Sequence, residues 1–195
     1  MNEKKAVPGI PDHEFMRGEV PMTKEEIRVI SLAKLALERH HVLYDIGAGT
    51  GSVTVEAALL MPEGKVFAIE EKESAGELIQ RNAAQYSLEN VQLVPGKAPG
   101  CLEGLPAPDR VFIGGSGGQL QTIIETLAEL LPEGGRIVIN AVTLETTYQA
   151  VNLMEMNGFT VDAVSLSLSK MKKAGKVHMW QALNPVTIAW GVKGG

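Results

Sequence analysis

The sequence has little cysteine, no excess of basic residues and no long apolar run, and each shortage excludes a class of protein. Cys101 is the only cysteine among 195 residues, so the chain can form neither an internal disulfide nor a thiolate metal cluster. The 18 Lys and Arg are outnumbered by 23 Asp and Glu, which gives a net charge of −5. That balance argues against a surface that neutralises nucleic acid phosphates. No stretch approaches the roughly 20 apolar residues that span a bilayer.

The first residues are also not expected to be a secretory signal, because two lysines are followed by no apolar core. We therefore expect a cytoplasmic protein with no membrane, nucleic acid or metal partner. A chain of this length is most simply one domain, covering residues 1–195, and it is large enough to bury roughly 70% of the surface of its unfolded form. Residues 1–22 are predicted to form an extended leader before the first helix.

The first helix begins with a capping-box pattern, TKEE at residues 23–26. In such a box the Thr23 hydroxyl accepts from the Glu26 amide, and the Glu26 carboxylate accepts from the Thr23 amide. The pattern predicts a helix from this point to about Glu38.

Beyond residue 40, strand and helix patterns alternate. The strands are short apolar runs, as expected of parallel strands that are covered on both faces. One helix carries an apolar stripe at three-four spacing, formed by Leu120, Ile123, Ile124, Leu127 and Leu131. The predicted strands lie at residues 42–46, 65–70, 91–94, 109–114 and 136–142, and the predicted helices at 52–61, 73–87, 117–131 and 144–157.

The end of the chain has a different pattern, because residues 160–169 and 185–192 alternate apolar and polar with period two. The first run changes phase between Ala163 and Val164, which predicts a β-bulge. Two such strands, joined by residues 170–184, are predicted to form an antiparallel hairpin appended to the parallel sheet. By analogy of fold, this α/β architecture is similar to that of class I methyltransferases and of other doubly wound enzymes.

A glycine-rich turn, DIGAGTG at residues 45–51, follows the first of these strands. Ligands of open α/β sheets lie at such turns, where Gly47, Gly49 and Gly51 let the main chain approach closely. A dinucleotide fingerprint has another glycine at the position of Ser52, and no Lys-Ser or Lys-Thr pair follows as in a P-loop. The pattern therefore favours a ligand that has a ribose and lacks phosphates.

Glu70 ends the second strand, about twenty residues after the turn, where a carboxylate can bind both ribose hydroxyls. NAD sites and S-adenosylmethionine sites share this acid, so Glu70 does not distinguish them. The glycine spacing after Asp45 favours S-adenosylmethionine, whose ammonium and sulfonium suit a carboxylate better than a pyrophosphate does.

Six segments together resemble the decarboxylating methyltransferases of anaerobic cobalamin biosynthesis, over nearly the whole chain. The resemblance implies a Rossmann-like class I methyltransferase with a mostly parallel seven-stranded sheet and a C-terminal antiparallel hairpin. It also implies methylation of carbon 15 of cobalt-precorrin-6B, or its metal-free analogue, with loss of the ring C acetate carboxyl as carbon dioxide. The segments are GIPDHEF (9–15), VPMTKEEIR (20–28), DIGAGTGSVTVE (45–56), FIGGSGG (112–118), PEGGRIVINAVTLET (132–146) and NPVTI (184–188).

The resemblance also assigns a cofactor site for S-adenosylmethionine. This chain departs from the family at Lys97, where an aspartate is common, so we expect the main chain at Lys97 and Ala98 to recognise the adenine. The implied cofactor residues are Thr23, Gly47, Ala48, Gly49, Thr50, Gly51, Glu70 and Ala98.

The implied substrate is a polycarboxylate tetrapyrrole. Its carboxylates need cations, and among the available ones Arg17 is the first choice, because a guanidinium binds a carboxylate with two hydrogen bonds. The small residues Gly115, Ser116 and Gly117 leave an open floor for a flat macrocycle. The sequence does not assign a catalytic residue among the proton-transfer candidates His13, Glu145, Tyr148 and His178.

Known relatives of this family form tetramers, and Met171, Met179 and Trp180 lie as apolar residues within a basic segment. We therefore expect a homotetramer. The chain has no separate domain for methylation at carbon 5, so a separate protein is expected to act there. Two alternatives stay open: a methyltransferase for tRNA adenine or protein isoaspartyl groups, and a protein that binds S-adenosylmethionine or a tetrapyrrole without turnover.

Overall fold

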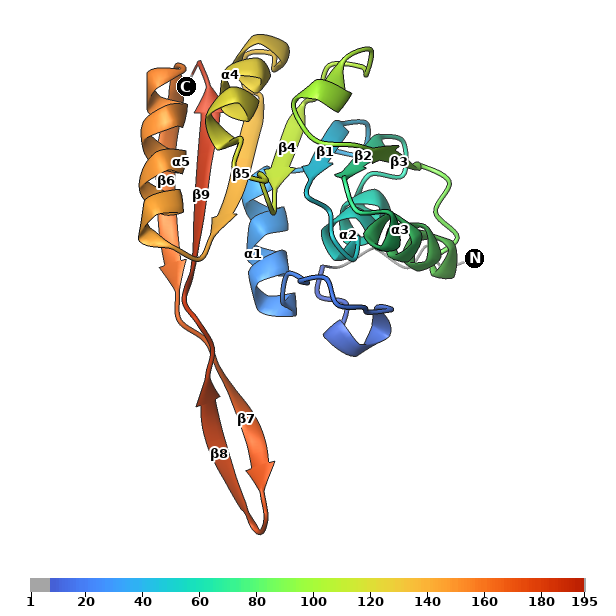
Figure 1. Ribbon diagram of the computed structural model, residues 1–195, viewed down its shortest axis with the longest axis vertical. Helices are drawn as coiled ribbons and strands as arrows, with labels where there is room; N and C mark the ends of the chain where they lie inside the picture. Colours follow the sequence, from blue (N-terminus) through green and yellow to red (C-terminus); the bar gives the residue numbers. More distant parts are fainter. Residues whose placement is uncertain (1–7, 195) are drawn as a thin grey trace.

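The computed structural model describes residues 8–194, and its core is one seven-stranded sheet (Figure 1). The strand order is β3-β2-β1-β4-β5-β9-β6. Strands β3, β2, β1, β4 and β5 are parallel to one another, whereas β9 is antiparallel to both β5 and β6. The predicted mostly parallel sheet with antiparallel C-terminal strands is confirmed. The bounds are β1 Val42–Ile46, β2 Lys65–Glu70, β3 Val91–Pro95, β4 Arg110–Ile113, β5 Arg136–Ala141, β6 Phe159–Leu166 and β9 Val186–Lys193.

Helices cover both faces of this sheet. Helices α1, α2 and α3 pack on one face, and α4 and α5 pack on the other. The apolar stripe predicted for α4 is confirmed, because all five of its residues are buried in the core. The bounds are α1 Glu25–Leu35, α2 Ser52–Leu60, α3 Glu73–Gln85, α4 Leu120–Leu130 and α5 Leu144–Met156, with short 3₁₀ turns at Asp12–Glu14 and Gly100–Leu102.

The start of α1 differs from the predicted capping box. Lys24 is the N-cap residue and its side chain makes no capping bond. Instead, the Glu25 amide donates to Oδ1 of Asp12 at 2.9 Å. The cap therefore comes from the leader, which approaches the helix from a distance of 13 residues in sequence. Residues 1–7 of that predicted leader lie outside the described residues.

The helix also ends at Leu35, before the predicted end at about Glu38. Ala36 takes a left-handed conformation with φ of 47°, and its amide donates to the Ala33 carbonyl. Nε of Arg110 donates a hydrogen bond to the Leu35 carbonyl, the last of the helix, at 2.8 Å. A cation at this end also suits the helix dipole.

The bulge predicted in β6 is wrong, because β6 and β9 pair in continuous register across Ala163 and Val164. The change of phase has another cause. Val161 packs in the core on the α4 and α5 face, whereas Val164 and Leu166 pack in the core on the α1 face. An edge strand whose two ends are covered on opposite faces shifts its apolar pattern without any insertion.

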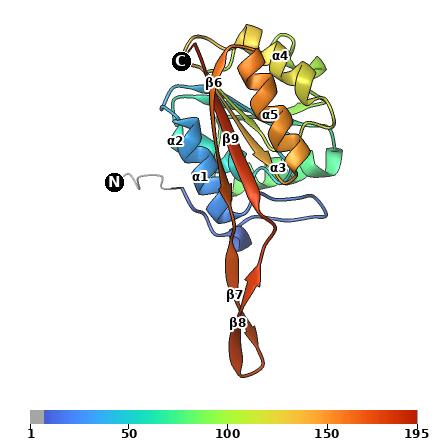
Figure 2. The ribbon, with the colours of Figure 1, turned by 90° about the vertical axis from the view of Figure 1, so that its left-hand side faces the viewer.

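The segment between β6 and β9 forms a second, two-stranded sheet of β7 (Ser169–Ala174) and β8 (Val177–Ala182). Figures 1 and 2 show this arm, residues 169–182, extending away from the main sheet in both views. Its large apolar side chains are exposed, and Trp180 has an exposed fraction of 75%. Among residues 8–194, no helix combines the length and apolar content that crossing a bilayer requires.

Candidate functional site

A pocket opens at the carboxyl ends of β1, β2, β3 and β4, where ligands of open α/β sheets bind. The first three residues of the glycine turn (residues 47–51), namely Gly47, Ala48 and Gly49, form its inner wall, and the leader forms the opposite wall. The lining residues are Val20, Pro21, Thr23, Ile46, Gly47, Ala48, Gly49, Val53, Ile69, Glu70, Glu71, Lys72, Gly96, Lys97, Ala98, Phe112, Gly114, Gly115, Ser116, Gly117 and Ile123.

The glycine turn is packed so closely that side chains would not fit at two positions. Gly47 has a φ of +71°, and a Cβ atom there would lie 2.6 Å from the Gly115 carbonyl oxygen. Gly49 has a φ of +58°, and a Cβ atom there would lie 2.9 Å from the Pro21 carbonyl oxygen. The first contact joins the turn to the loop after β4, and the second joins it to the leader. Glycine therefore lets three chain segments converge on one pocket.

Glu70 lines this pocket at the end of β2 and also holds the glycine turn. Its Oε2 accepts the Gly49 amide at 2.9 Å, and its Oε1 accepts the Lys72 amide at 3.0 Å. A carboxylate has about four lone-pair sites, so both oxygens can accept further bonds from the pocket side. This is the arrangement that binding a ribose diol requires.

The loop after β4 gives a floor of small residues, and Gly115, Ser116 and Gly117 all line the pocket as the sequence predicted. Lys97 extends across from the end of β3 to this floor. A Cβ atom on Gly117 would lie 2.8 Å from the Cε of Lys97. The Lys97 side chain thus lies over a glycine, while the adjacent Ala98 is buried in the pocket wall.

Asp45, by contrast, does not line the pocket, so the inference that its carboxylate faces the ligand is wrong. Its side chain points to the α2 face of the sheet and is completely buried. The Thr54 hydroxyl donates to Oδ2 of Asp45 at 2.5 Å, and Oδ1 has no hydrogen-bond partner. Burial raises the pKa of Asp45 to about 7, although the bonds from Thr54 act to lower it.

The structure brings most of the expected cofactor residues together, but not all of them. Thr23 lines the pocket as part of the leader wall. Thr50 and Gly51 lie behind the pocket: the Thr50 side chain is buried, and Gly51 packs against the Cα atom of Ile79. Arg17 is exposed and does not line the pocket. The described residues that line the pocket also include none of the four proton-transfer candidates, His13, Glu145, Tyr148 and His178.

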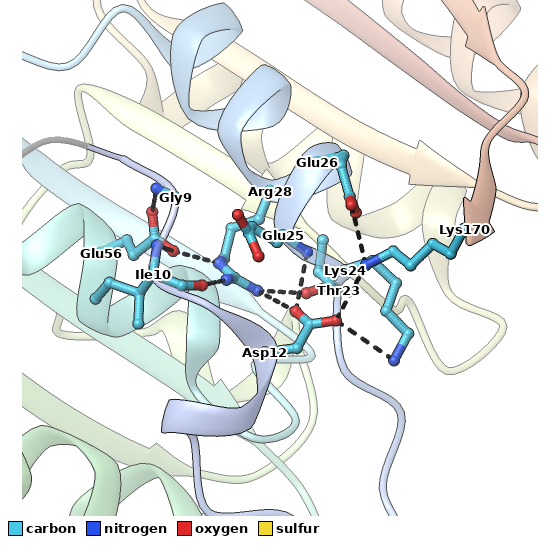
Figure 3. Close-up of polar contacts among 10 residues, drawn as sticks. All are labelled: Gly9, Ile10, Asp12, Thr23, Lys24, Glu25, Glu26, Arg28, Glu56 and Lys170. Atoms are coloured by element: carbon cyan, nitrogen blue, oxygen red, sulfur yellow. Dashed lines mark hydrogen bonds and ion pairs between the residues drawn. The ribbon is translucent and has the colours of Figure 1, made fainter. Parts of the chain in front are cut away.

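A buried ion pair fastens the leader behind the pocket (Figure 3). Arg28 of α1 is 0% exposed, and its Nε donates to Oε1 of Glu56 of α2 at 2.5 Å. The Glu56 carboxylate also accepts the leader amides of Gly9, at 2.7 Å, and Ile10, at 3.0 Å. Arg28 in turn donates to the carbonyls of Ile10 and Thr23. Sequence reasoning missed this pair, although one signal was present: an acid within the otherwise apolar run of α2.

At the opposite end of the sheet, three potential metal ligands, Glu38, His40 and His41, lie within 4.8 Å of one another. Nδ1 of His41 accepts the Glu38 amide at 2.9 Å. The neutral ring therefore carries its proton on Nε2, which leaves neither ring nitrogen with a free lone pair for a metal. Burial and the nearby Arg110 lower the pKa of His41, so the neutral ring is the favoured form.

Comparisons with known proteins agree with this geometry. Residues 14–193 match the precorrin methyltransferase domain family. A probable cobalt-precorrin-6B C(15)-methyltransferase (decarboxylating) of Sulfurisphaera tokodaii is 43% identical, over 96% of this chain and 98% of the relative. The cobalt-precorrin-6B C(15)-methyltransferase (decarboxylating) of Salmonella typhi is 40% identical, over 91% of this chain and 92% of the relative. The crystal structure of precorrin-6Y C5,15-methyltransferase from Geobacter metallireducens has a TM-score of 0.91 and 42% identity, over 96% and 99% of the two chains.

Proposed function

Because the chain belongs to the precorrin methyltransferase family, we propose that it uses S-adenosylmethionine to methylate carbon 15 of cobalt-precorrin-6B or its metal-free analogue. The proposed reaction also removes the carboxyl group of the ring C acetate, in cobalamin biosynthesis. The observation that carries this proposal is similarity at 40% to 43% identity to relatives with that name, over nearly the full length of both chains.

The pocket fits a nucleoside without phosphates. Glu70 provides acceptors for the ribose hydroxyls at the end of β2. The apolar side chains of Ile69 and Ile123 and the buried Ala98 line the part of the pocket that suits a flat adenine. Thr23 and the glycine turn line the remaining part, where an amino acid tail can reach main-chain groups. We propose these residues as the cofactor site.

When bound, S-adenosylmethionine supplies a methyl group on a sulfonium, which is already a good leaving group. The residues of this chain therefore need only orient the two reactants in line and exclude water. The glycine-rich floor, residues 114–117, lies beside the pocket and leaves space for a flat macrocycle. Just beyond the end of β5, Val142, Leu144 and Tyr148 are highly exposed apolar residues, and they suit contact with the apolar face of such a ring.

Decarboxylation breaks the bond between the acetate methylene and its carboxyl carbon. The electron pair passes into the conjugated macrocycle, and a proton from water takes the place of the carboxyl group. Arg17 stays our first candidate for holding a carboxylate arm. A carboxylated tetrapyrrole titrated into Arg17→Ala should bind more weakly than to the wild type at low salt, and unchanged affinity would overturn this assignment.

The experiment that tests the proposed function is turnover of cobalt-precorrin-6B with S-adenosylmethionine, followed by mass spectrometry. We expect a product that has gained one methyl group and lost one carbon dioxide. Methylation of tRNA or of isoaspartyl peptides in parallel reactions, with no change in the tetrapyrrole, would instead support the rival methyltransferases. Binding of the tetrapyrrole without any product would support a non-catalytic binding protein.

Calorimetric titration tests the cofactor site separately. S-adenosylhomocysteine should bind and NADH should not. Glu70→Ala should weaken S-adenosylhomocysteine binding roughly 10- to 100-fold, the range expected for lost hydrogen bonds to a charged group. Glu77→Ala is the matched control, because Glu77 is an exposed acid of the following helix outside the pocket. Equal affinities for the two variants would exclude Glu70 from the site.

We also propose that the chain forms a homotetramer through the arm, and that a separate protein methylates carbon 5. The exposed apolar side chains of the arm, among them Met171 and Trp180, support the first part. Light scattering should show a smaller assembly for Trp180→Lys. Tyr148→Lys is the control, because Tyr148 is equally exposed but lies on α5. The purified chain should leave carbon 5 of its product unmethylated.

A further inference from the structure

The two walls of the pocket come from segments that are far apart in sequence, and something must hold them together. The leader wall consists of Val20, Pro21 and Thr23, and the inner wall is the glycine turn. The two walls approach each other closely at Pro21 and Gly49. A Cβ atom on Gly49 would lie only 2.9 Å from the Pro21 carbonyl oxygen. The spacing of these walls sets the width of the pocket, so residues that fix both walls control how well a ligand fits.

Asn82 of α3 bonds, through one side chain, to the two segments that carry these walls. Its Oδ1 accepts the amide of Met16 in the leader at 2.8 Å. Its Nδ2 donates to the Met16 carbonyl at 3.1 Å and to the Thr50 carbonyl of the glycine turn at 2.8 Å. Asn82 is 0% exposed, so water cannot replace these bonds. It does not line the pocket and therefore acts through the leader and the turn.

Arg28 fixes the leader on the other side of the pocket wall. Its Nη1 donates to the Thr23 carbonyl at 2.6 Å, and its guanidinium lies 4.8 Å from the centre of the Phe15 ring. The wall segment, residues 17–22, thus lies between two anchors, Met16 bonded to Asn82 and Thr23 bonded to Arg28. Of these two anchors, only Asn82 also holds the glycine turn.

We propose that Asn82 is a positioning residue for the cofactor pocket, which holds the leader wall at a fixed spacing from the glycine turn. This inference rests on the proposed function only in naming the ligand as S-adenosylmethionine. Loss of the Asn82 amide frees the leader to move away from the turn, and the pocket widens. Ligand affinity then falls by more than it does in a variant that loses similar stability elsewhere in the fold.

Asn90 provides a matched control within the same chain. Its Nδ2 also donates to two main-chain carbonyls, those of Ala58 at 3.0 Å and Met61 at 2.8 Å. These lie at the C-terminal end of α2, whereas the glycine turn lies at the N-terminal end. Asn82→Ala removes three hydrogen bonds and Asn90→Ala removes two, but only the first variant loses bonds to the segments that carry the pocket walls.

The experiment measures S-adenosylhomocysteine affinity by calorimetry, KM for S-adenosylmethionine and kcat by turnover, and stability by urea unfolding. We expect both variants to unfold at lower urea. Asn82→Ala should bind S-adenosylhomocysteine roughly tenfold more weakly and raise KM about as much, with little change in kcat, while Asn90→Ala keeps wild-type affinity. If Asn82→Ala fails to fold, Asn82→Ser, whose hydroxyl can keep one bond, is measured in its place.

Hydrogen exchange separates this inference from the proposed function, because it needs no ligand. Amides of residues 9–23 should exchange faster in Asn82→Ala than in the wild type or in Asn90→Ala. Unchanged exchange of the leader, or equal loss of affinity in both variants, would overturn the inference. A wild-type protein that does not bind S-adenosylhomocysteine would overturn the proposed function, and the exchange rates would still decide whether Asn82 positions the leader.

Discussion

The pocket region and the arm differ in which side chains they bury: the first buries polar side chains, and the second exposes apolar ones. Around the pocket, the polar side chains of Arg28, Glu56 and Asn82 are buried and bond to partners within the same chain. In the arm, β7 and β8 pair only with each other, and their large apolar side chains are exposed. A two-stranded ribbon is marginally stable by itself. The comparison indicates that the pocket region satisfies its polar side chains within the chain, whereas the arm leaves its large apolar side chains exposed.

The largest effect on this comparison is expected from Arg28→Met. The change leaves the Glu56 carboxylate buried without its cation, which costs about 3 to 5 kcal/mol when a buried pair is broken. Urea unfolding should show this loss. Arg110→Met is the control, since Arg110 is only half-buried and bonds to the main-chain carbonyls of Leu35 and Ala36 at the end of α1.

A smaller loss from Arg28→Met than from Arg110→Met would contradict the inference that the buried pair with Glu56 contributes more to stability than the half-buried Arg110 does. A double variant sharpens the test. Removing both charges with Arg28→Met and Glu56→Gln should recover part of the lost stability, because no unpaired charge is then left buried.

A second prediction uses the pH dependence of Asp45, a buried group next to the turn. Its pKa is about 7 in the folded protein, well above the ordinary value of 3.8. The folded state therefore binds more protons than the unfolded state between these pH values, and its stability falls as pH rises toward 7. Asp45→Asn carries no charge and lacks this dependence.

Relative to the wild type, the unfolding free energy of Asp45→Asn should therefore rise by about 2.5 kcal/mol between about pH 5 and pH 8. Urea unfolding at the two pH values measures this difference. A parallel pH dependence for the two proteins would show that the carboxyl ionises at its ordinary pKa in the fold.

The sheet was predictable from the sequence because its signals are local. Apolar runs, the glycine turn and the three-four stripe of α4 each depend on a few adjacent residues, and the structure confirms the elements that they predict. The pattern of β6 was misread because its two ends are covered by different helices. A periodicity identifies the apolar side of a strand, but it does not show which face of the sheet a helix covers.

The candidate site was predictable only in part, for a related reason. The glycine turn and Glu70 are recognised by their spacing along the chain, and the structure places Gly47, Gly49 and Glu70 around one pocket. The contacts of Asp12 and Asn82 join residues 13 and 66 positions apart. Such long-range bonds leave no periodic signal, so the leader anchors could not be inferred from the sequence.

The smallest effect on stability is expected at Lys170. Among the described residues, this is the one place where ion pairs join the arm to the leader and α1. Lys170 of the arm lies 3.0 Å from Oε1 of Glu26 and 3.9 Å from Oδ2 of Asp12, the residue that caps α1 (Figure 3). Glu26 raises the pKa of Lys170 through this hydrogen bond. The lysine is therefore engaged within the chain, and we expect it to orient the arm.

Both partners of this pair are partly exposed, so Lys170→Ala should lower the unfolding free energy by about 0.2 to 1 kcal/mol. Lys172→Ala, two residues further along the arm, should have no measurable effect, and high salt should reduce the difference between the two variants. Equal unfolding free energies at low salt would show that the arm is not held by its base. The contrast with the pocket region, whose polar side chains bond within the chain, would then be sharper still.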